Sequence, residues 1–238
     1  MNYDLKGDVP FPIAEIHLGA GDKVQIENGS MIYFNSQVSL DGHLNSNGKT
    51  GFKGLMSALG RGGITSGESI FITTASSSAD GGEIAIAPGN PGVIKELEAN
   101  DKQQWRLNTG AFLASDESVN YNMIRQKTSA ALFGDTGGFF IMETRGTGTL
   151  LVSAYGDLIP LDLNDVNDYA VDNDHVAAWS QTLDYNIEAA SGFIGFKTGE
   201  GLVNHFSGTG RVYVQTRNLQ ALADILEPYL PIDTSSSD

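Results

Sequence analysis

The sequence contains no cysteine, which excludes disulfide bridges, thiolate zinc sites and cysteine nucleophiles. It also contains no apolar run near the roughly 18 residues that a membrane-spanning helix needs. The longest such run, at 139–142, is followed directly by Glu143. The first residues lack the basic and then apolar order of a secretion signal. We therefore expect a cytoplasmic protein without a membrane span.

Positive charge is scarce as well. The chain has 14 Lys plus Arg against 29 Asp plus Glu, which gives a formal net charge of −15, and its basic residues form no stripe. Affinity for nucleic acid depends mainly on Lys and Arg that neutralise phosphates. The composition therefore argues against a nucleic-acid partner.

Glycine, in contrast, is abundant. The 29 glycines against 7 prolines are typical of many tight turns between short strands. A hydrophobic share of 40% and an aromatic share of 9% are sufficient for a core. We expect an all-β protein that forms a single domain over 1–238.

One stretch of sequence occurs three times without gaps. VQIENG at 24–29, WRLNTG at 105–110 and YAVDND at 169–174 each read large apolar, polar, aliphatic, polar and two turn-forming residues. The copies lie 81 and 64 residues apart, and such repetition predicts three similar structural units, at approximately 10–89, 90–155 and 156–218. Alternation before each turn predicts that six side chains face the core: Val24, Ile26, Trp105, Leu107, Tyr169 and Val171.

Each unit is expected to begin with two strands joined as a hairpin at these turns, since Asn28-Gly29 is a strong hairpin signal. Its second half contains another strand pair, with an identical Gly-Thr-Gly turn at 146–148 and 208–210. The first unit also carries a Gly-, Ser- and Asn-rich excursion at 41–66. A loop of this length is functional or mobile, and a lid, a partner surface and a mobile segment all remain open.

The chain ends with a predicted helix over 219–230. Asn218 is a suitable N-cap, and Pro228 and Pro231 end the pattern. We expect this helix to cover an open edge or end of the sheet, or else to make an oligomer contact, and we expect 232–238 to be a disordered tail. Its apolar residues recur at helical spacing: Leu219, Leu222, Ile225, Leu226 and Tyr229.

No catalytic, cofactor-binding or metal-binding residue is predicted. Gly48-Lys49-Thr50 lacks the upstream glycine of a phosphate-binding loop, because His43 stands there. No Gly-x-Ser-x-Gly elbow occurs, so a serine hydrolase has no anchor. We therefore expect the protein not to be an enzyme and to need no cofactor.

The histidines and acidic residues are expected to be structural or solvated. His17, His43, His175 and His205 show no spacing of metal ligands, and Asp116-Glu117 lies in a turn-like segment. An acidic run in the third unit lacks the glycine and the closing glutamate of a calcium loop, and we interpret it as a solvated face: Asp157, Asp162, Asp165, Asp168, Asp172 and Asp174.

An ordered set of short motifs resembles a known family. The motifs are SGESIF at 66–71, IAP at 86–88 with PGVI at 91–94, GAFLA at 110–114, GTG at 146–148, VDNDHVAAW at 171–179, and FSGTG at 206–210 with VQTR at 214–217. Together they resemble a bacterial family of unknown function that is related to a yeast protein named for altered inheritance of mitochondria. The resemblance implies a fold like the tryptophan RNA-binding attenuation protein, with three antiparallel β units about a pseudo-threefold axis and the last unit packed against the N-terminal strands. It implies no catalytic residues.

Two functional hypotheses follow. The first is a non-enzymatic scaffold or interaction protein that forms a homo-oligomer, because unpaired edges of the units favour self-association. The second is a protein that binds a small molecule in clefts between the units or beneath 41–66. RNA binding by analogy of fold is disfavoured, because the chain is acidic and no lysine recurs at equivalent repeat positions.

Overall fold

The computed structural model describes residues 1–45, 70–125, 140–191 and 201–230. Nearly all of its regular structure is strand, and the α-helix among the described residues is α4 (Leu219–Leu226) at the C-terminal end. The prediction of an all-β protein with a short C-terminal helix is confirmed. The expected excursion begins inside a strand, and its remainder at 46–66 lies outside the described residues, as does the expected tail at 232–238.

The strands form three sets that follow the sequence repeat. The first unit, preceded by β1 (Asn2–Lys6), contains β2 (Ile13–Leu18), β3 (Lys23–Glu27), β4 (Met31–Phe34), β5 (Val38–Asn45), β6 (Ile70–Ser77) and β7 (Gly82–Ile86). The second contains β8 (Gly92–Ala99), β9 (Trp105–Asn108), β10 (Phe112–Asp116), β11 (Val119–Arg125), β12 (Phe140–Gly146) and β13 (Gly148–Tyr155). The third contains β14 (Leu158–Asp172), β15 (Val176–Ser180), β16 (Asp184–Ser191) and β17 (Leu202–Gln215).

In the third unit, long strands replace pairs of shorter ones. The first part of β14 corresponds to β8 and its second part to β9, while β17 spans the positions of β12 and β13. Gly208 within β17 has a φ of 101°, close to the 104° of Gly146, the last residue of β12. The backbone thus makes the same corner at both Gly-Thr-Gly sequences, although the strand is interrupted only in the second unit.

The sheets are shared between units. One runs β5-β6-β3-β10-β13-β8, so the first three strands come from the first unit and the last three from the second. The next runs β11-β12-β9-β15-β17-β14 and joins the second unit to the third in the same way, with β16 also paired to β17. The remaining sheet, β1-β2-β7-β4, contains strands of the first unit and the N-terminal strand.

This sharing corrects the prediction of hairpins. Asn28-Gly29 does form a turn, but β3 pairs with β6 and β10, whereas β4 pairs with β7 in another sheet. The corresponding turns of the later units are the 3-10 helices η1 (Thr109–Ala111) and η2 (Asn173–His175). The turn residues therefore take the chain around a corner from one sheet to the next, because each unit contributes strands to two sheets.

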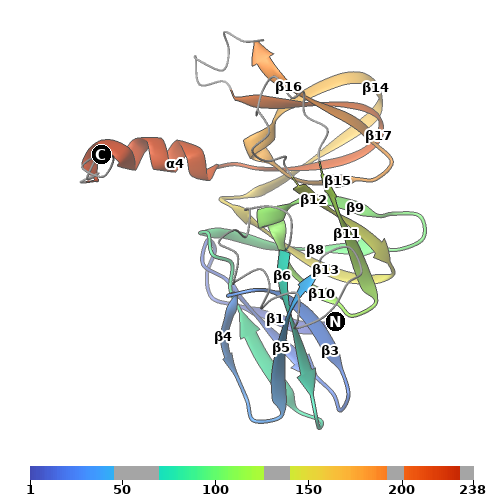
Figure 1. Ribbon diagram of the computed structural model, residues 1–238, viewed down its shortest axis with the longest axis vertical. Coiled ribbons are helices and arrows are strands. Elements are labelled where there is room, and N and C mark those ends of the chain that lie inside the picture. The colour runs from blue at the N-terminus through green and yellow to red at the C-terminus, as the bar shows by residue number, and fades with distance from the viewer. Residues whose placement is uncertain (46–69, 126–139, 192–200, 231–238) are drawn as a thin grey trace, which may run out of the picture.

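The units follow one another along the long axis of the molecule (Figure 1). The first unit lies in the lower part of that view, the third at the top, and the second between them. No pairing among the described residues joins the third unit to the N-terminal strands. The expected packing of those two parts is therefore not observed, because sheet sharing connects only successive units; the pseudo-threefold axis stays a prediction of the resemblance.

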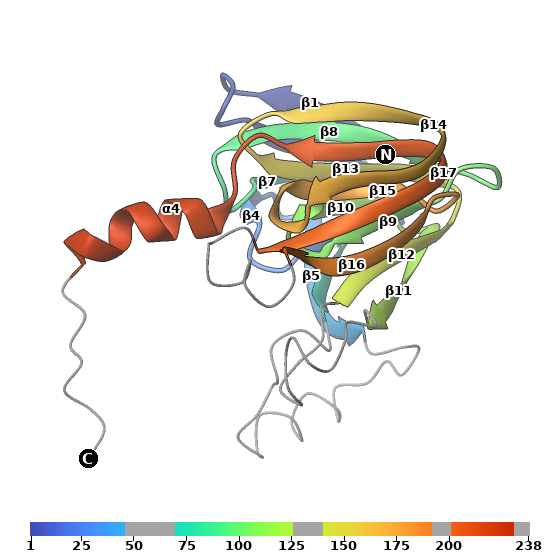
Figure 2. The same ribbon diagram turned by 90° about the horizontal axis from the view of Figure 1, so that it is seen from above.

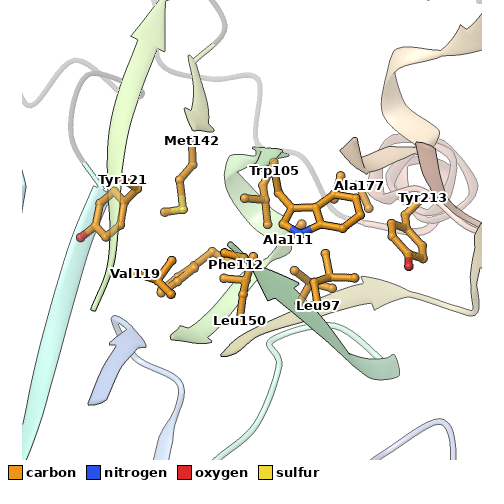
Figure 3. Close-up of a cluster of buried hydrophobic side chains, with 14 of the residues drawn as sticks. Leu97, Trp105, Ala111, Phe112, Val119, Tyr121, Met142, Leu150, Ala177 and Tyr213 are labelled. Carbon is orange, nitrogen blue, oxygen red and sulfur yellow. The ribbon is translucent and has the colours of Figure 1, made fainter. Parts of the chain in front are cut away.

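The core lies where successive units meet. Its largest cluster includes Trp105 and Phe112 together with side chains from all three units, among them Ile72 of the first unit. Figure 3 shows Trp105, Phe112 and, from the third unit, Tyr213 in this cluster. The ring centres of Trp105 and Tyr213 are 5.7 Å apart, which is a favourable distance for a tilted aromatic pair. Because small sets of strands bury little apolar surface alone, we expect this burial between units to stabilise the three together.

The C-terminal helix begins as predicted but does not cover a sheet. The Asn218 side chain accepts a hydrogen bond of 2.7 Å from the backbone N–H of Ala221 and so caps α4. The helix continues into the 3-10 turn η3 (Glu227–Tyr229), and none of its residues is buried. Figure 2 shows α4 projecting from the strands, so the expected cover of a sheet edge is wrong. No described helix is long and apolar enough to cross a membrane.

Candidate functional site

The junction between two units is built by one strand pair. β3 of the first unit pairs antiparallel with β10 of the second, with Ile26 opposite Ala114. β9 of the second unit pairs with β15 of the third, with Leu107 opposite Ala178. Both junctions thus use the same repeat positions in the same register, and all four of these residues are buried.

The strands that would form a third junction of this kind have no such partner within the described chain. β4 occupies the repeat position of β10 and β15 but pairs only with β7. The second part of β14 occupies the position of β3 and β9 but pairs only with β17. The described chain therefore ends in one unpaired strand edge on its first unit and a complementary one on its third.

Burial follows this difference. Val24, Ile26, Trp105 and Leu107 are buried, as predicted. Tyr169 is 40% exposed, so the prediction that it lies in the core is wrong. Val171 is partly buried and packs against the edge of a core cluster, so for this residue the prediction holds in part. Their strand has the expected apolar pattern, but among the described strands only β17 pairs with it.

Clefts also recur between the units. One, of about 660 Å³, lies between the second and third units and is lined in part by Glu98, Trp105 and Arg211. Another, of about 420 Å³, lies between the first and second units and includes His17 and Val24, which are the repeat equivalents of Glu98 and Trp105. The repeat thus produces a similar hollow at both junctions.

The larger cleft contains one strong ion pair. The guanidinium of Arg211 donates to both carboxylate oxygens of Asp162, at 2.6 and 2.9 Å. This hydrogen bonding lowers the pKa of Asp162 and raises that of Arg211. The Arg211 guanidinium also lies 5.9 Å from the ring centre of Tyr213, within the range of a cation–π contact.

The cleft of about 420 Å³ between the first and second units is lined by residues that make charged contacts. The sequence did not reveal these contacts. Asp116 accepts a hydrogen bond of 2.7 Å from the backbone N–H of Thr149 and lies 2.8 Å from the amino group of Met1. Glu117 accepts from Lys23 of the first unit at 2.9 Å. The Asp116-Glu117 pair, predicted to be merely solvated, therefore contributes contacts between units, and only the pairing of the strands could have shown this.

One group of described side chains has the composition of a metal site. Oxygen or nitrogen atoms of Glu15, His17 and Glu83 lie within 4.8 Å of one another on β2 and β7. The carboxylate of Glu15 is buried and already accepts hydrogen bonds from Lys6 and from the hydroxyl of Tyr33. These hydrogen bonds, chiefly that from Lys6, lower the pKa of Glu15. The arrangement is a salt-bridged network beside β4, in which Lys6 binds Oε1 of Glu15, the same oxygen that lies 4.0 Å from His17 Nε2.

The other histidines contact different parts of the third unit. His205 Nδ1 lies 2.7 Å from Asp168, and His175 lies 2.7 Å from the carbonyl of Gln215 and 2.9 Å from the amide nitrogen of Asn218. The last contact borders a third cleft of about 310 Å³, next to the start of α4. The side chain of His43 and the segment 48–50 lie outside the described parts of the chain.

The acidic run of the third unit does not converge. Asp162 pairs with Arg211 and Asp168 with His205, while Asp172 accepts from the backbone N–H of Asp174 and caps η2. Among the described residues, none of these aspartates belongs to a group with the geometry of a metal site.

Comparison with known proteins agrees with this architecture. A crystal structure of a Streptococcus pyogenes protein is 41% identical and superposes with a TM-score of 0.79, covering 96% of this chain and 99% of that one. An uncharacterized protein of Streptococcus pyogenes serotype M6 is 45% identical over 238 residues, which cover all of this chain and 93% of the relative. The family model described as "Mitochondrial biogenesis AIM24" matches residues 3–217, and that family has no defined biochemical function. The chain belongs to the AIM24 family.

Proposed function

We propose that the protein is a non-enzymatic scaffold that associates with further copies of itself through the unpaired edges of its terminal units. The observation that carries this proposal is the exposure of β4. Its four residues are all apolar or aromatic, and each is between 39% and 48% exposed: Met31, Ile32, Tyr33 and Phe34.

An exposed apolar edge strand is unusual in a protein that acts alone. Such an edge has unpaired N–H and C=O groups that can pair with a strand of another chain. Proteins normally protect it with charges, proline or a covering element. β4 contains no charged residue and no proline, and it forms the end of its sheet. Covering this edge with a second copy would bury apolar surface and satisfy its backbone groups.

The charged groups support a structural rather than a catalytic role. Arg211 in the larger cleft is paired with Asp162, and Glu15 beside β4 is paired with Lys6. Arg106 at the second junction is paired with Glu143 at 3.0 Å and donates to the carbonyl of Leu183 at 2.9 Å. These contacts fix strands and neighbouring units relative to one another, which is the requirement of a scaffold.

Light scattering coupled to size-exclusion chromatography tests the proposal. We expect a mass that is a multiple of the 25.3 kDa chain and that decreases on dilution. Phe34→Lys places a charge on the exposed edge and should yield the monomer with unchanged circular dichroism. A wild-type protein that remains monomeric at high concentration would contradict self-association.

A second candidate function is binding of a small molecule in the cleft of about 660 Å³. Its volume falls in the ordinary range for ligand sites. Its lining combines the aromatic Trp105 with the Arg211–Asp162 ion pair and the carboxylates of Glu96 and Glu98. A thermal-shift screen against metabolites of either charge tests it. Stabilisation that disappears in Arg211→Gln but persists in the exposed-loop control Lys102→Gln would support this function, and a screen without any shift would argue against it.

A further inference from the structure

We infer that β4 of one copy pairs antiparallel with the second part of β14 of another copy, so that a third shared sheet forms between two chains. This inference rests on the proposed self-association and specifies its interface. It follows from the strand pairings. The same junction occurs twice within the described chain, and the two strand edges that form it occur again on the terminal units, where neither edge has a partner among the described strands.

The two internal junctions define the register of the third. In the first, Ile26 lies opposite Ala114 and Gln25 opposite Ser115. In the second, the equivalent positions are paired in the same way. Transferring this register by the repeat spacings places Tyr33 opposite Val171 of the other copy, followed by Phe34 opposite Ala170 and Asn35 opposite Tyr169.

The β4 edge already has the shape that the junction requires. β10 and β15 each show a register shift against their neighbour in the same unit, between Phe112 and Ala114 and between Val176 and Ala178. β4 shows the shift at the equivalent place, between Met31 and Tyr33. Because β10 and β15 pair on both sides despite this irregularity, it does not prevent β4 from accepting a second neighbour.

The second part of β14 is paired on one side only, at the repeat positions where β9 is paired on both sides. β9 is held on one side by β12, with Leu107 opposite Met142, and receives β15 on the other side. The second part of β14 is held by β17, with Val171 opposite Asn204, at the corresponding repeat positions. Its other side has no partner among the described strands, and that is the side on which the junction would form.

The β4 edge and the β14 edge of one chain cannot pair with each other in this conformation. The first and third units lie at opposite ends of the molecule, with the second unit between them (Figure 1). Each copy therefore offers one β4 edge and one β14 edge to two different neighbours. Such a head-to-tail contact produces a closed ring when the rotation between copies closes, and an open filament when it does not. A two-fold contact of β4 with itself would leave the β14 edge unpaired.

Cysteine cross-linking tests the register, and the natural chain contributes no cysteine of its own. Four single variants are required: Tyr33→Cys, Phe34→Cys, Ala170→Cys and Val171→Cys. Mixing Tyr33→Cys with Val171→Cys, or Phe34→Cys with Ala170→Cys, should give under mild oxidation a covalent dimer of twice the 25.3 kDa chain mass. The crossed mixtures are matched controls and should give little dimer, because adjacent residues of a strand point to opposite faces.

The outcomes are distinguishable. Equal cross-linking in paired and crossed mixtures, or dimers formed by Tyr33→Cys alone, would overturn the inferred register. An assembly that persists in light scattering while no mixture cross-links would overturn the interface but leave the proposed scaffold function standing. Monomeric mass for the cysteine-free chain would remove both. Circular dichroism and thermal melting of each variant establish that it is folded, and these four residues lie on exposed or half-buried strand edges.

Discussion

Strands β10 and β4 occupy the same place in successive units yet lie in opposite environments. β10 is buried along almost its whole length, whereas every residue of β4 is exposed. Both strands begin with two large apolar residues, both carry the same register shift and both pair with the last strand of their own unit. The difference is the neighbour: β10 receives β3 of the preceding unit, and within the described chain β4 has no preceding unit.

The third unit shows the complementary difference. Trp105 of β9 is buried against the following unit, whereas the equivalent Tyr169 of β14 is exposed. At these junction positions, burial therefore depends on whether a neighbouring unit packs against the strand. The comparison between inner and terminal units can be tested by substitutions at matched repeat positions.

The largest effect is expected from truncating a buried residue of β10. Leu113→Ala removes a fully buried side chain and should lower the free energy of unfolding by about 2–5 kcal/mol. The matched Ile32→Ala on β4 removes an exposed side chain and should lower it by less than about 1 kcal/mol. Urea unfolding at a concentration where the protein is monomeric provides the comparison. Equal losses at both positions would show that β4 is already buried within one chain.

A second pair of substitutions compares the glycine corners of the second and third units. Both Gly146 and Gly208 have positive φ, which costs an alanine about 1–2 kcal/mol. A methyl group at Gly146 would also lie 2.2 Å from the carbonyl oxygen of Ser118, whereas at Gly208 its nearest neighbour, the carbonyl oxygen of Thr182, is 3.6 Å away. Gly146→Ala should therefore destabilise the protein more than Gly208→Ala in thermal unfolding. The reverse order would contradict the tighter packing of the inner unit.

A third prediction concerns pH at the first junction. Burial raises the pKa of Glu27 from its ordinary value of 4.5 to about 7. The folded protein therefore binds this proton more tightly than the unfolded chain does, and the free energy of unfolding should fall as pH rises from about 4.5 to about 7. The full difference in pKa sets an upper limit of about 3.5 kcal/mol, at about 1.4 kcal/mol per unit. Because Glu27 is only partly buried, solvent screening should make the measured change smaller than this limit.

Glu27→Gln should remove this pH dependence and stabilise the protein at pH 8. The equivalent residue of the second junction, Asn108, carries an amide that donates to the carbonyl of Val176 at 2.5 Å, so an amide suits this position. Urea unfolding of both proteins at pH 5 and pH 8 measures the effect. Identical pH dependence in wild type and variant would rule out Glu27 as its source.

The smallest effect is expected at the C-terminal helix. None of the residues of α4 is buried, so a chain that ends after Asn218 should unfold with a free energy within about 0.5 kcal/mol of the full chain. It should also retain its assembled mass, since the inferred interface lies on β4 and β14. Loss of assembly on truncation would instead identify α4 as the contact between copies.

The sequence predicted the repeat well because its evidence is local. The alternating pattern before each turn predicts strands at 24–27 and 105–108, and β3 and β9 are found there with Ile26 and Leu107 buried. The cap of the C-terminal helix was equally predictable, since Asn218 acts on a backbone group three residues away.

Pairing between strands could not be predicted in the same way. Asn28-Gly29 indicates a turn but does not specify whether the strand after it returns to the same sheet or enters another, and here β4 enters another. The exposure of Tyr169 was missed for a related reason. Equivalent positions of the three repeats carry apolar residues in every copy, so the sequence pattern alone predicts the same burial for each. Whether a given copy is buried depends on which other unit packs against it.

Amide hydrogen exchange at two protein concentrations tests the central claim most directly, because it reports whether the edge of β4 is paired in solution. We expect protection at 31–34 and 169–172 to rise with concentration together with the assembled mass, while protection of β10 stays constant. Assembly without any change of exchange at these two edges would contradict the account.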